Sequence, residues 1–275
     1  MREFQHLALF PPHGHGKKSN RVFVAEHVRK ERRVADSVTC GNTSHPSRGD
    51  SWRMFDRVVG RYDFLNRVLS LRRDVAWRKR LARMLPEGDA LRVLDLATGT
   101  GDVLLAALAA RPGAACVLGL DMAGNMLARC REKLACAQAS DAAKLVRGDV
   151  AVIAATDKTF DAVTMAFGIR NMPDVHVSLR EAWRVLKPGG RLLILEFSMP
   201  RKPFRWVYLL YLRHILPRVA GWISGDSAAY EYLNRTIEDF PFGDAFCRLM
   251  IEAGFRHVSA TPLTFGIATL YVGER

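Results

Sequence analysis

The residues of this chain that are best suited to chemistry lie in and after a two-glycine turn, DLATGTGD at residues 95–102. A short apolar run ends within this segment. Gly99 and Gly101 let the backbone approach a ligand closely and adopt conformations that a side chain forbids. Asp121 ends the next apolar run, 20 positions after Gly101. Because this spacing puts a carboxylate at the tip of a neighbouring strand, Asp121 can accept both ribose hydroxyls of a ligand. The turn therefore predicts a nucleoside-binding site.

The nucleoside expected at this turn carries no phosphates. The dehydrogenase fingerprint G-x-G-x-x-G needs a glycine where the chain has Leu104, and Asp102 directly follows the second glycine. A carboxylate at that position repels a pyrophosphate and suits a ligand with an ammonium group. Asp149 ends a third apolar run and can accept a hydrogen bond from an adenine amino group. Two alternatives stay open: a tight turn with nothing bound at 99–101, and an Asx-turn at Asp149.

Alternating strands and helices are expected to hold these residues at one edge of a sheet. The last two apolar runs are joined by a turn too short for a parallel crossover, so they predict an antiparallel hairpin. The fold class is therefore α/β: a Rossmann-like, mostly parallel seven-stranded sheet with an antiparallel edge hairpin and helices on both faces. We expect strands at 92–97, 115–120, 144–147, 160–166, 191–197, 257–262 and 267–272, with helices at 103–110, 125–137, 175–186 and 242–253.

Three segments lie outside this alternation. Residues 1–50 are predicted to be a basic N-terminal tail, so a single domain is expected over 51–275. Within it, 51–88 is predicted to be a helical lid and 203–240 a set of inserted helices. The aromatic and basic residues within 203–240 suit a cradle for an apolar tail, a membrane interface or a buried cap helix.

The net charge of +13 is concentrated at the N-terminus, with +4 in residues 1–50, +7 in 51–83 and +2 in 84–275. Such a basic segment indicates either an anionic surface nearby or a solvated basic helix face. No recognised RNA-binding module accompanies it, so nucleic acid is not an expected partner. No apolar run approaches the length of about 18 residues that a membrane span requires. The five cysteines form no CxxC pair, so neither a disulfide framework nor a metal site is expected.

The order DLATGTGD, GLD, RGD and a fourth strand resembles the class I S-adenosylmethionine-dependent methyltransferases. Further segments are similar to the ubiquinone/menaquinone biosynthesis C-methyltransferase family, and the resemblance runs from about residue 52 to the C-terminus. The chain has Asp74 where that family usually has His, and Val150 where it usually has Ala. The segments that carry the family resemblance are YDFLN at 62–66 with Ser70 and Trp77-Arg78, FGIRNM at 167–172 and LKPGGRLLILEFS at 186–198.

This resemblance implies S-adenosylmethionine as cofactor and a prenylated quinol, demethylmenaquinol or a ubiquinol-precursor benzoquinol, as the substrate methylated on a ring carbon. Arg170 is expected to hold the ring phenolate and to position a water that accepts the proton, since a guanidinium stays protonated. Asn171 would orient the quinol or the arginine. For Arg170, a salt bridge with Asp174 or Glu196 is the open alternative. The implied cofactor-binding residues are Asp95, Gly99, Thr100, Gly101, Asp121, Met122, Asp149 and Val150.

Several alternatives to this function stay open. A class I methyltransferase acting on RNA or on another small molecule would share the cofactor site. A nicotinamide oxidoreductase is opposed by Leu104 and Asp102, and a non-catalytic cofactor-binding subunit would keep the motif. We expect a cytoplasmic protein held peripherally on a membrane, or a mitochondrial matrix protein if the tail is a transit peptide. A homodimer is the assembly left open, and the sequence does not separate menaquinone from ubiquinone as the product.

Overall fold

The computed structural model describes residues 48–70, 72–88, 90–114, 116–200, 202–215, 218 and 227–275. The predicted basic tail at 1–50 lies outside these residues, apart from the short 3₁₀ helix η1 (Arg48–Asp50). Part of the predicted inserted helices, at 216–217 and 219–226, lies outside them as well. All described residues belong to one compact unit, 45–275.

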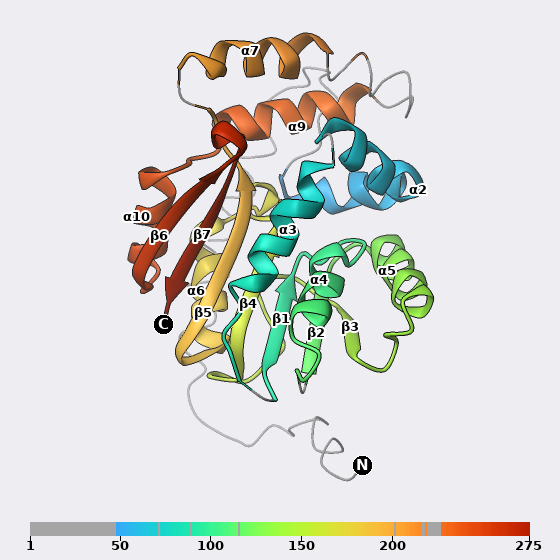
Figure 1. The fold of residues 1–275 in the computed structure, drawn as a ribbon, viewed down its shortest axis with the longest axis vertical. Helices are drawn as coiled ribbons and strands as arrows, with labels where there is room; N and C mark the ends of the chain where they lie inside the picture. Colours follow the sequence, from blue (N-terminus) through green and yellow to red (C-terminus); the bar gives the residue numbers. More distant parts are fainter. Residues whose placement is uncertain are drawn as a thin grey trace, which may run out of the picture. The chain divides into compact units, whose positions relative to one another are not determined.

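A seven-stranded sheet with the order β3-β2-β1-β4-β5-β7-β6 forms the centre of this unit (Figure 1). The neighbours from β3 through β5 pair in parallel, whereas β7 is antiparallel to both β5 and β6. The predicted fold class is therefore confirmed, including its antiparallel edge hairpin. The strands are β1 (Arg92–Leu96), β2 (Cys116–Asp121), β3 (Ala143–Arg147), β4 (Phe160–Ala166), β5 (Leu186–Phe197), β6 (Arg256–Leu263) and β7 (Ala268–Glu274).

Helices cover both faces of the sheet, and each face has its own apolar core. On one face, Leu81, Leu104 and Leu134 pack against strand side chains such as Val93. On the other face, Leu179 and Phe246 belong to a second cluster. The first face is covered by α3 (Arg73–Arg83), α4 (Asp102–Ala110) and α5 (Gly124–Cys136), and the second by α6 (Val175–Val185) and α10 (Asp244–Glu252).

The predicted start of the fifth strand, at residue 191, is wrong. β5 begins at Leu186, which pairs with Phe160, and the register then shifts before the next pair. The segment Pro188-Gly189-Gly190 is typical of a loop, but here it continues the strand through an irregularity. A Cβ on Gly190 would lie only 2.9 Å from the Lys187 carbonyl oxygen, so this close approach of two backbones requires glycine.

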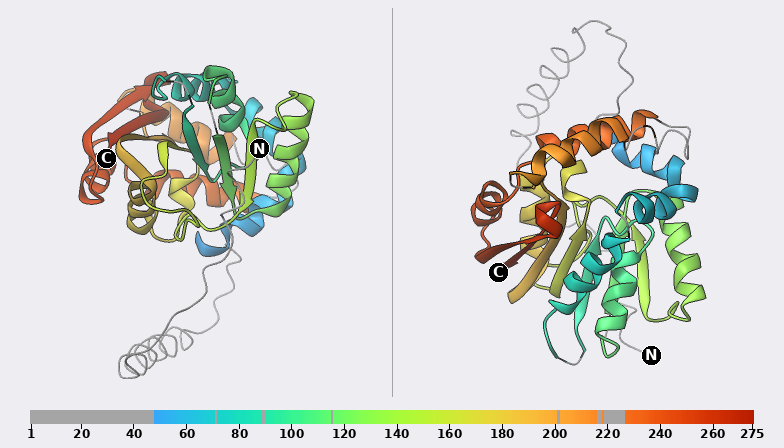
Figure 2. Two further views of the ribbon diagram at one scale, coloured as in Figure 1. Left: turned by 90° about the horizontal axis from the view of Figure 1, so that it is seen from below. Right: turned by 45° about the horizontal axis from the view of Figure 1, so that its top comes forward.

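Further helices gather over the carboxyl ends of the parallel strands, where Figures 1 and 2 show α2, α7 and α9 together. None of the helices in the described ranges has the length and hydropathy that crossing a bilayer requires. The segments at this end are α2 (Ser51–Leu69), the 3₁₀ turn η2 (Ile169–Asn171), α7 (Phe204–Leu210), the π-helix η3 (Tyr211–Ile215), α9 (Ser227–Asp239) and the 3₁₀ turn η4 (Thr264–Gly266).

Candidate active site

The two glycines of the turn between β1 and α4 have different roles. Both have positive φ, 55° at Gly99 and 81° at Gly101, which favours glycine. A Cβ on Gly99 would meet no atom within 4 Å, whereas one on Gly101 would clash with the Sγ atom of Cys130. Gly99 therefore faces open space that a ligand can enter, and Gly101 lets the turn pack against α5.

Asp121, at the end of β2, is joined to the glycine turn. Its Oδ2 atom accepts a hydrogen bond from the Gly99 N–H at 2.8 Å, and its Oδ1 atom accepts one from the Ala123 N–H at 2.8 Å. Burial raises the pKa of this carboxyl. A carboxylate offers about four acceptor positions, so Asp121 keeps acceptor capacity for a ribose hydroxyl. The neighbouring Met122 accepts a hydrogen bond from Arg147 Nε through its carbonyl, at 2.9 Å.

Asp95 supports the turn from below. Its carboxylate is buried and accepts hydrogen bonds from the hydroxyls of Thr98 and Thr164, each at 2.6 Å. Thr98 lies in the turn and Thr164 on β4, so this carboxylate connects the turn to the neighbouring strand. The structure thus gives Asp95 a positioning role, while its predicted contact with the cofactor stays a prediction.

Replacing Asp95 with Asn should change how stability depends on pH. Burial raises the pKa of this carboxyl from 3.8 to about 6, so the folded chain holds the proton more tightly than the unfolded chain does. The stability that this proton confers is complete below the unfolded pKa and is lost as the pH rises through the folded one. As the pH rises from about 3 to 7, the free energy of unfolding of Asp95→Asn, measured in urea, should therefore increase by about 3 kcal/mol relative to that of wild type. A difference that is constant across this range would contradict the assignment.

Asp149 and Val150 follow β3 at the same edge of the sheet. The Asp149 side chain is exposed, and its Oδ1 atom accepts a hydrogen bond from the Ala151 N–H at 2.8 Å. The Asx-turn considered for this residue is therefore present, and it leaves Oδ2 available for an adenine amino group. Val150 is buried in an apolar core, so a cofactor could contact it only through its backbone.

Asp102 is the centre of an ion-pair network that joins α2, α3, α4 and α5. Its carboxylate contacts Arg67 at 2.7 Å, Arg78 at 3.5 Å and Lys133. Burial by itself would raise the pKa of Asp102, but Arg78 and Lys133 lower it to about 2. These cations occupy the carboxylate that we expected to face a ligand ammonium. The network, called here the α2 clasp, consists of Asp63, Asp74, Asp102, Arg67, Arg78 and Lys133.

Through the α2 clasp, helix α2 lies against the glycine turn and α5. The Thr100 hydroxyl donates a hydrogen bond to Asp63 at 2.6 Å and accepts one from Lys133 at 3.1 Å. Nearer the start of α2, Asp56 accepts a hydrogen bond from the Asn125 N–H at 2.7 Å, in the first turn of α5. The side chain of Thr100, predicted to touch the cofactor, is thus engaged with α2.

Lys133→Met should loosen α2 without altering the sheet. The Lys133 side chain is only 18% exposed and contacts two carboxylates of the α2 clasp, so its removal leaves them short of a partner. We expect the free energy of unfolding, measured in urea, to fall by about 3 kcal/mol, and the backbone amides of α2 to exchange hydrogen faster. The matched control is Arg129→Met on the same helix, since Arg129 is 49% exposed and pairs only at the surface with Glu132. Equal losses in both variants would contradict this role of the clasp.

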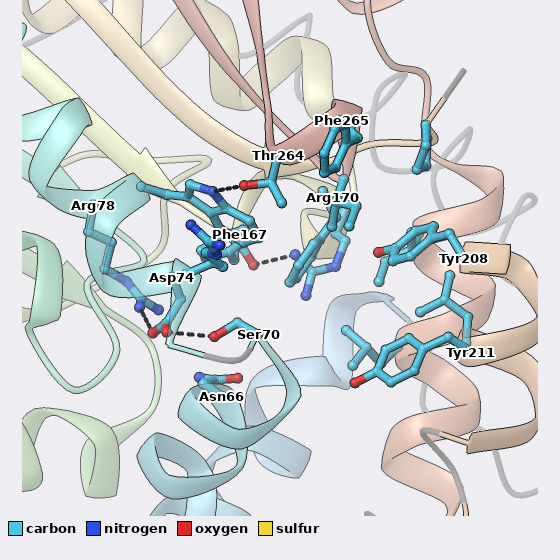
Figure 3. Close-up of a pocket in the computed structure, with 18 of the residues that line it drawn as sticks. Asn66, Ser70, Asp74, Arg78, Phe167, Arg170, Tyr208, Tyr211, Thr264 and Phe265 are labelled. Atoms are coloured by element: carbon cyan, nitrogen blue, oxygen red, sulfur yellow. Dashed lines mark hydrogen bonds and ion pairs between the residues drawn. The ribbon is translucent and has the colours of Figure 1, made fainter. Parts of the chain in front are cut away.

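A cavity of about 520 Å³ lies between α2, α3, the residues at the ends of β4 and β5, and the α7–α9 region. Its volume is typical of a site for a drug-sized organic molecule. Aromatic side chains from several elements form much of its wall, as Figure 3 shows in part. The aromatic residues that line it are Phe55, Tyr62, Trp77, Phe167, Phe197, Phe204, Tyr208, Tyr211, Tyr232 and Phe265.

Arg170 projects into this cavity from η2 (Figure 3). Its Nη1 atom donates to the Phe167 carbonyl at 2.8 Å and to Glu196 Oε1 at 2.5 Å. The salt bridge considered as an alternative is therefore formed with Glu196, whereas Asp174 caps α6 by accepting from the Val177 N–H. The Nε atom of Arg170 is buried and has no hydrogen-bond partner within the described residues. Glu196 thus fixes the position of the guanidinium in the cavity wall.

Asn171 lies behind Arg170 rather than in the cavity wall. Its side-chain amide donates to the Phe167 carbonyl at 3.3 Å, the same oxygen that Arg170 contacts. A residue that the sequence did not indicate is Tyr232 of α9, which lines the cavity and whose buried hydroxyl has no partner in the described ranges. His214 of η3 could serve as a base by its residue type, but it is exposed and is not part of the wall.

The pKa shifts of three tyrosines in the cavity wall indicate that the cavity disfavours negative charge. Burial raises the pKa of Tyr62, Tyr208 and Tyr211. These hydroxyls therefore stay protonated at neutral pH and are poor bases. An oxyanion on a bound ligand would need a cation beside it, and the guanidinium of Arg170 is in position to be that cation.

Several known proteins that are similar to this chain over most of its described length are methyltransferases. Residues 47–275 match the model of the ubiE/COQ5 methyltransferase family. The chain is 47% identical to the ubiquinone/menaquinone biosynthesis C-methyltransferase UbiE of Syntrophotalea carbinolica, over 82% of this chain and 94% of that protein. It is 44% identical to the demethylmenaquinone methyltransferase of Thermus thermophilus, over 81% of this chain and 100% of that protein. In fold, it resembles a SAM-dependent methyltransferase from Thermotoga maritima, with a TM-score of 0.57 at 18% identity over 81% of this chain and 99% of that one.

Proposed function

The chain belongs to the ubiE/COQ5 methyltransferase family, and from this premise we propose that it methylates a ring carbon of a prenylated quinol. It is an S-adenosylmethionine-dependent methyltransferase. The observation that carries the choice of substrate is the aromatic cavity with the buried Arg170 in its wall. Mostly apolar walls suit a quinol ring with an isoprenoid chain and do not suit the phosphates of RNA.

The residues around the glycine turn fit S-adenosylmethionine. Gly99 faces open space, and Asp121 keeps acceptor capacity for the ribose. Asp149 keeps one oxygen for the adenine amino group. When bound, the cofactor supplies a methyl group that its sulfonium already activates.

The cavity walls would hold the quinol ring and exclude water from it. Loss of the proton from a ring hydroxyl makes the neighbouring carbon electron-rich, and the enzyme must hold that carbon roughly 3 Å from the methyl group. Arg170 stabilises the phenolate through its guanidinium, and a water beside it accepts the proton, since a guanidinium cannot. The hydrogen that the methyl group replaces leaves the ring carbon as a second proton when the ring regains its aromatic form, and the ring oxygen is then reprotonated. The unpartnered hydroxyl of Tyr232 is a second polar contact for a ring oxygen.

Transfer of labelled methyl groups tests this proposal. The purified chain is incubated with methyl-labelled S-adenosylmethionine and a lipid extract of cells lacking the protein, and in parallel with total RNA. We expect label in a quinone of the lipid extract and none in RNA. The same cells should accumulate the demethylated quinone, and its identity distinguishes demethylmenaquinone from the ubiquinone precursor. Label in RNA, or transfer to neither, would overturn the proposal.

A further inference from the structure

Large apolar side chains are exposed along α7 and its surroundings. Trp206 is 72% exposed and Phe265, on η4, is 71% exposed. Phe265 stacks on Phe204 with ring centroids 4.7 Å apart, which joins η4 to α7. Contiguous exposed apolar side chains of this kind mark interaction sites. The residues of this patch, called here the α7 surface, are Phe204, Trp206, Val207, Leu210, Ile215 and Phe265.

The chain segment that carries most of the α7 surface has charges of one sign. Residues 201–218 contain five Lys or Arg and no Asp or Glu. Lys202 and Arg205 are exposed beside the apolar residues, whereas Arg213 is paired with Glu238 of α9. Basic residues that flank exposed Trp and Phe are typical of segments that bind the interface of an anionic bilayer.

The α7 surface is continuous with the wall of the cavity. Phe204, Val207 and Phe265 line the cavity and are also exposed to the outside. A cavity of about 520 Å³ accommodates a quinol ring and the first part of its side chain, so a long prenyl chain would extend past these three residues.

From this continuity and charge we propose that the α7 surface docks on an anionic lipid bilayer, with the cavity opening toward the acyl chains. The prenyl chain then stays in the bilayer while the ring enters the cavity, so the chain is not transferred through water. Trp206 and Phe265 insert at the interface, and Lys202 and Arg205 contact the lipid phosphates. The docking rests on the proposed function only for the identity of the ligand.

Co-sedimentation with vesicles tests the docking independently of catalysis. The wild type should bind phosphatidylglycerol-containing vesicles more strongly than pure phosphatidylcholine vesicles, and added salt should weaken the binding. Trp206→Asp should weaken it by at least about tenfold. The matched control is Ile251→Asp, because Ile251 is 57% exposed on α10, outside the α7 surface.

Several outcomes would overturn this docking surface. One is that the wild type does not sediment with vesicles at all, and another is that it binds them without preference for anionic lipid. Equal effects of Trp206→Asp and Ile251→Asp on binding would count against the surface in the same way. A wild-type dimer that Trp206→Asp converts to a monomer, with no vesicle binding, would also overturn it and would identify the surface as an interface between copies.

Turnover measurements separate this proposal from the proposed function. Trp206 does not line the cavity, so Trp206→Asp should methylate a short-chain, water-soluble quinol at the wild-type rate. With a long-chain quinol in vesicles, its turnover should fall by about tenfold. Vesicle binding without methylation of either quinol would refute the function alone, and methylation of the soluble quinol without vesicle binding would refute the docking alone.

Discussion

Arg170→Ala is expected to lower the turnover number by about 100-fold or more, while the affinity for S-adenosylmethionine stays within about twofold of wild type. The reason is that Arg170 lines the aromatic cavity, where a phenolate would otherwise be poorly stabilised, and does not contact Gly99 or Asp121. Single-turnover kinetics with a quinol and calorimetry with S-adenosylmethionine measure the two quantities separately.

A purely structural role for Arg170 would give a different pattern. Removing the guanidinium leaves Glu196 buried without its cation, and this can destabilise the fold. Arg170→Lys retains a cation beside Glu196 but loses the planar guanidinium, so it should fold while remaining slow. Glu196→Gln keeps Arg170 and an acceptor, so it should lose much less activity than Arg170→Ala. Equal loss of activity in all three variants, in step with their thermal stability, would mean that only the ion pair matters.

Asp121→Ala should weaken the binding of S-adenosylmethionine by about 100-fold, because about 3 kcal/mol is expected from two ribose hydroxyls that donate to one carboxylate. Asp121→Asn retains one acceptor and should show an intermediate loss. Calorimetry measures both affinities, and NADH serves as the comparison ligand, for which no binding is expected.

The interpretation of Asp121 needs a control for the shape of the turn. The same carboxylate holds the N–H groups of Gly99 and Ala123, so its removal also relaxes the turn. Asp95→Asn changes another carboxylate that holds the turn but that is buried beneath it, and it should leave the affinity within about tenfold of wild type. If Asp121→Ala and Arg170→Ala lost affinity equally, the division between cofactor and substrate residues would be wrong.

The sequence predicted the sheet well because apolar runs and turn residues are local signals. β4 was expected at 160–166 and is found at Phe160–Ala166, and the antiparallel edge hairpin follows from a short connection alone. The start of β5 was missed because Pro188 and the two glycines after it are typical of a loop. Their place in the strand depends on a backbone approach between Lys187 and Gly190, which only the folded chain brings about.

The site was less predictable because its polar groups pair over long distances in the sequence. Asp102 and Thr100 look available for a ligand, but Arg67, Lys133 and Asp63 occupy them from other helices. No local sequence pattern predicts partners that come from distant helices. Tyr232 was missed for a related reason, since an aromatic residue on an inserted helix gives no sign of its direction until α9 is placed against the cavity.

The α2 clasp also determines how this part of the enzyme can open. Its contacts are ionic, so separating α2 from the glycine turn uncovers charged groups that water hydrates readily. Dissolved ions screen the attraction between such groups. Access to the donor site should therefore respond to ionic strength.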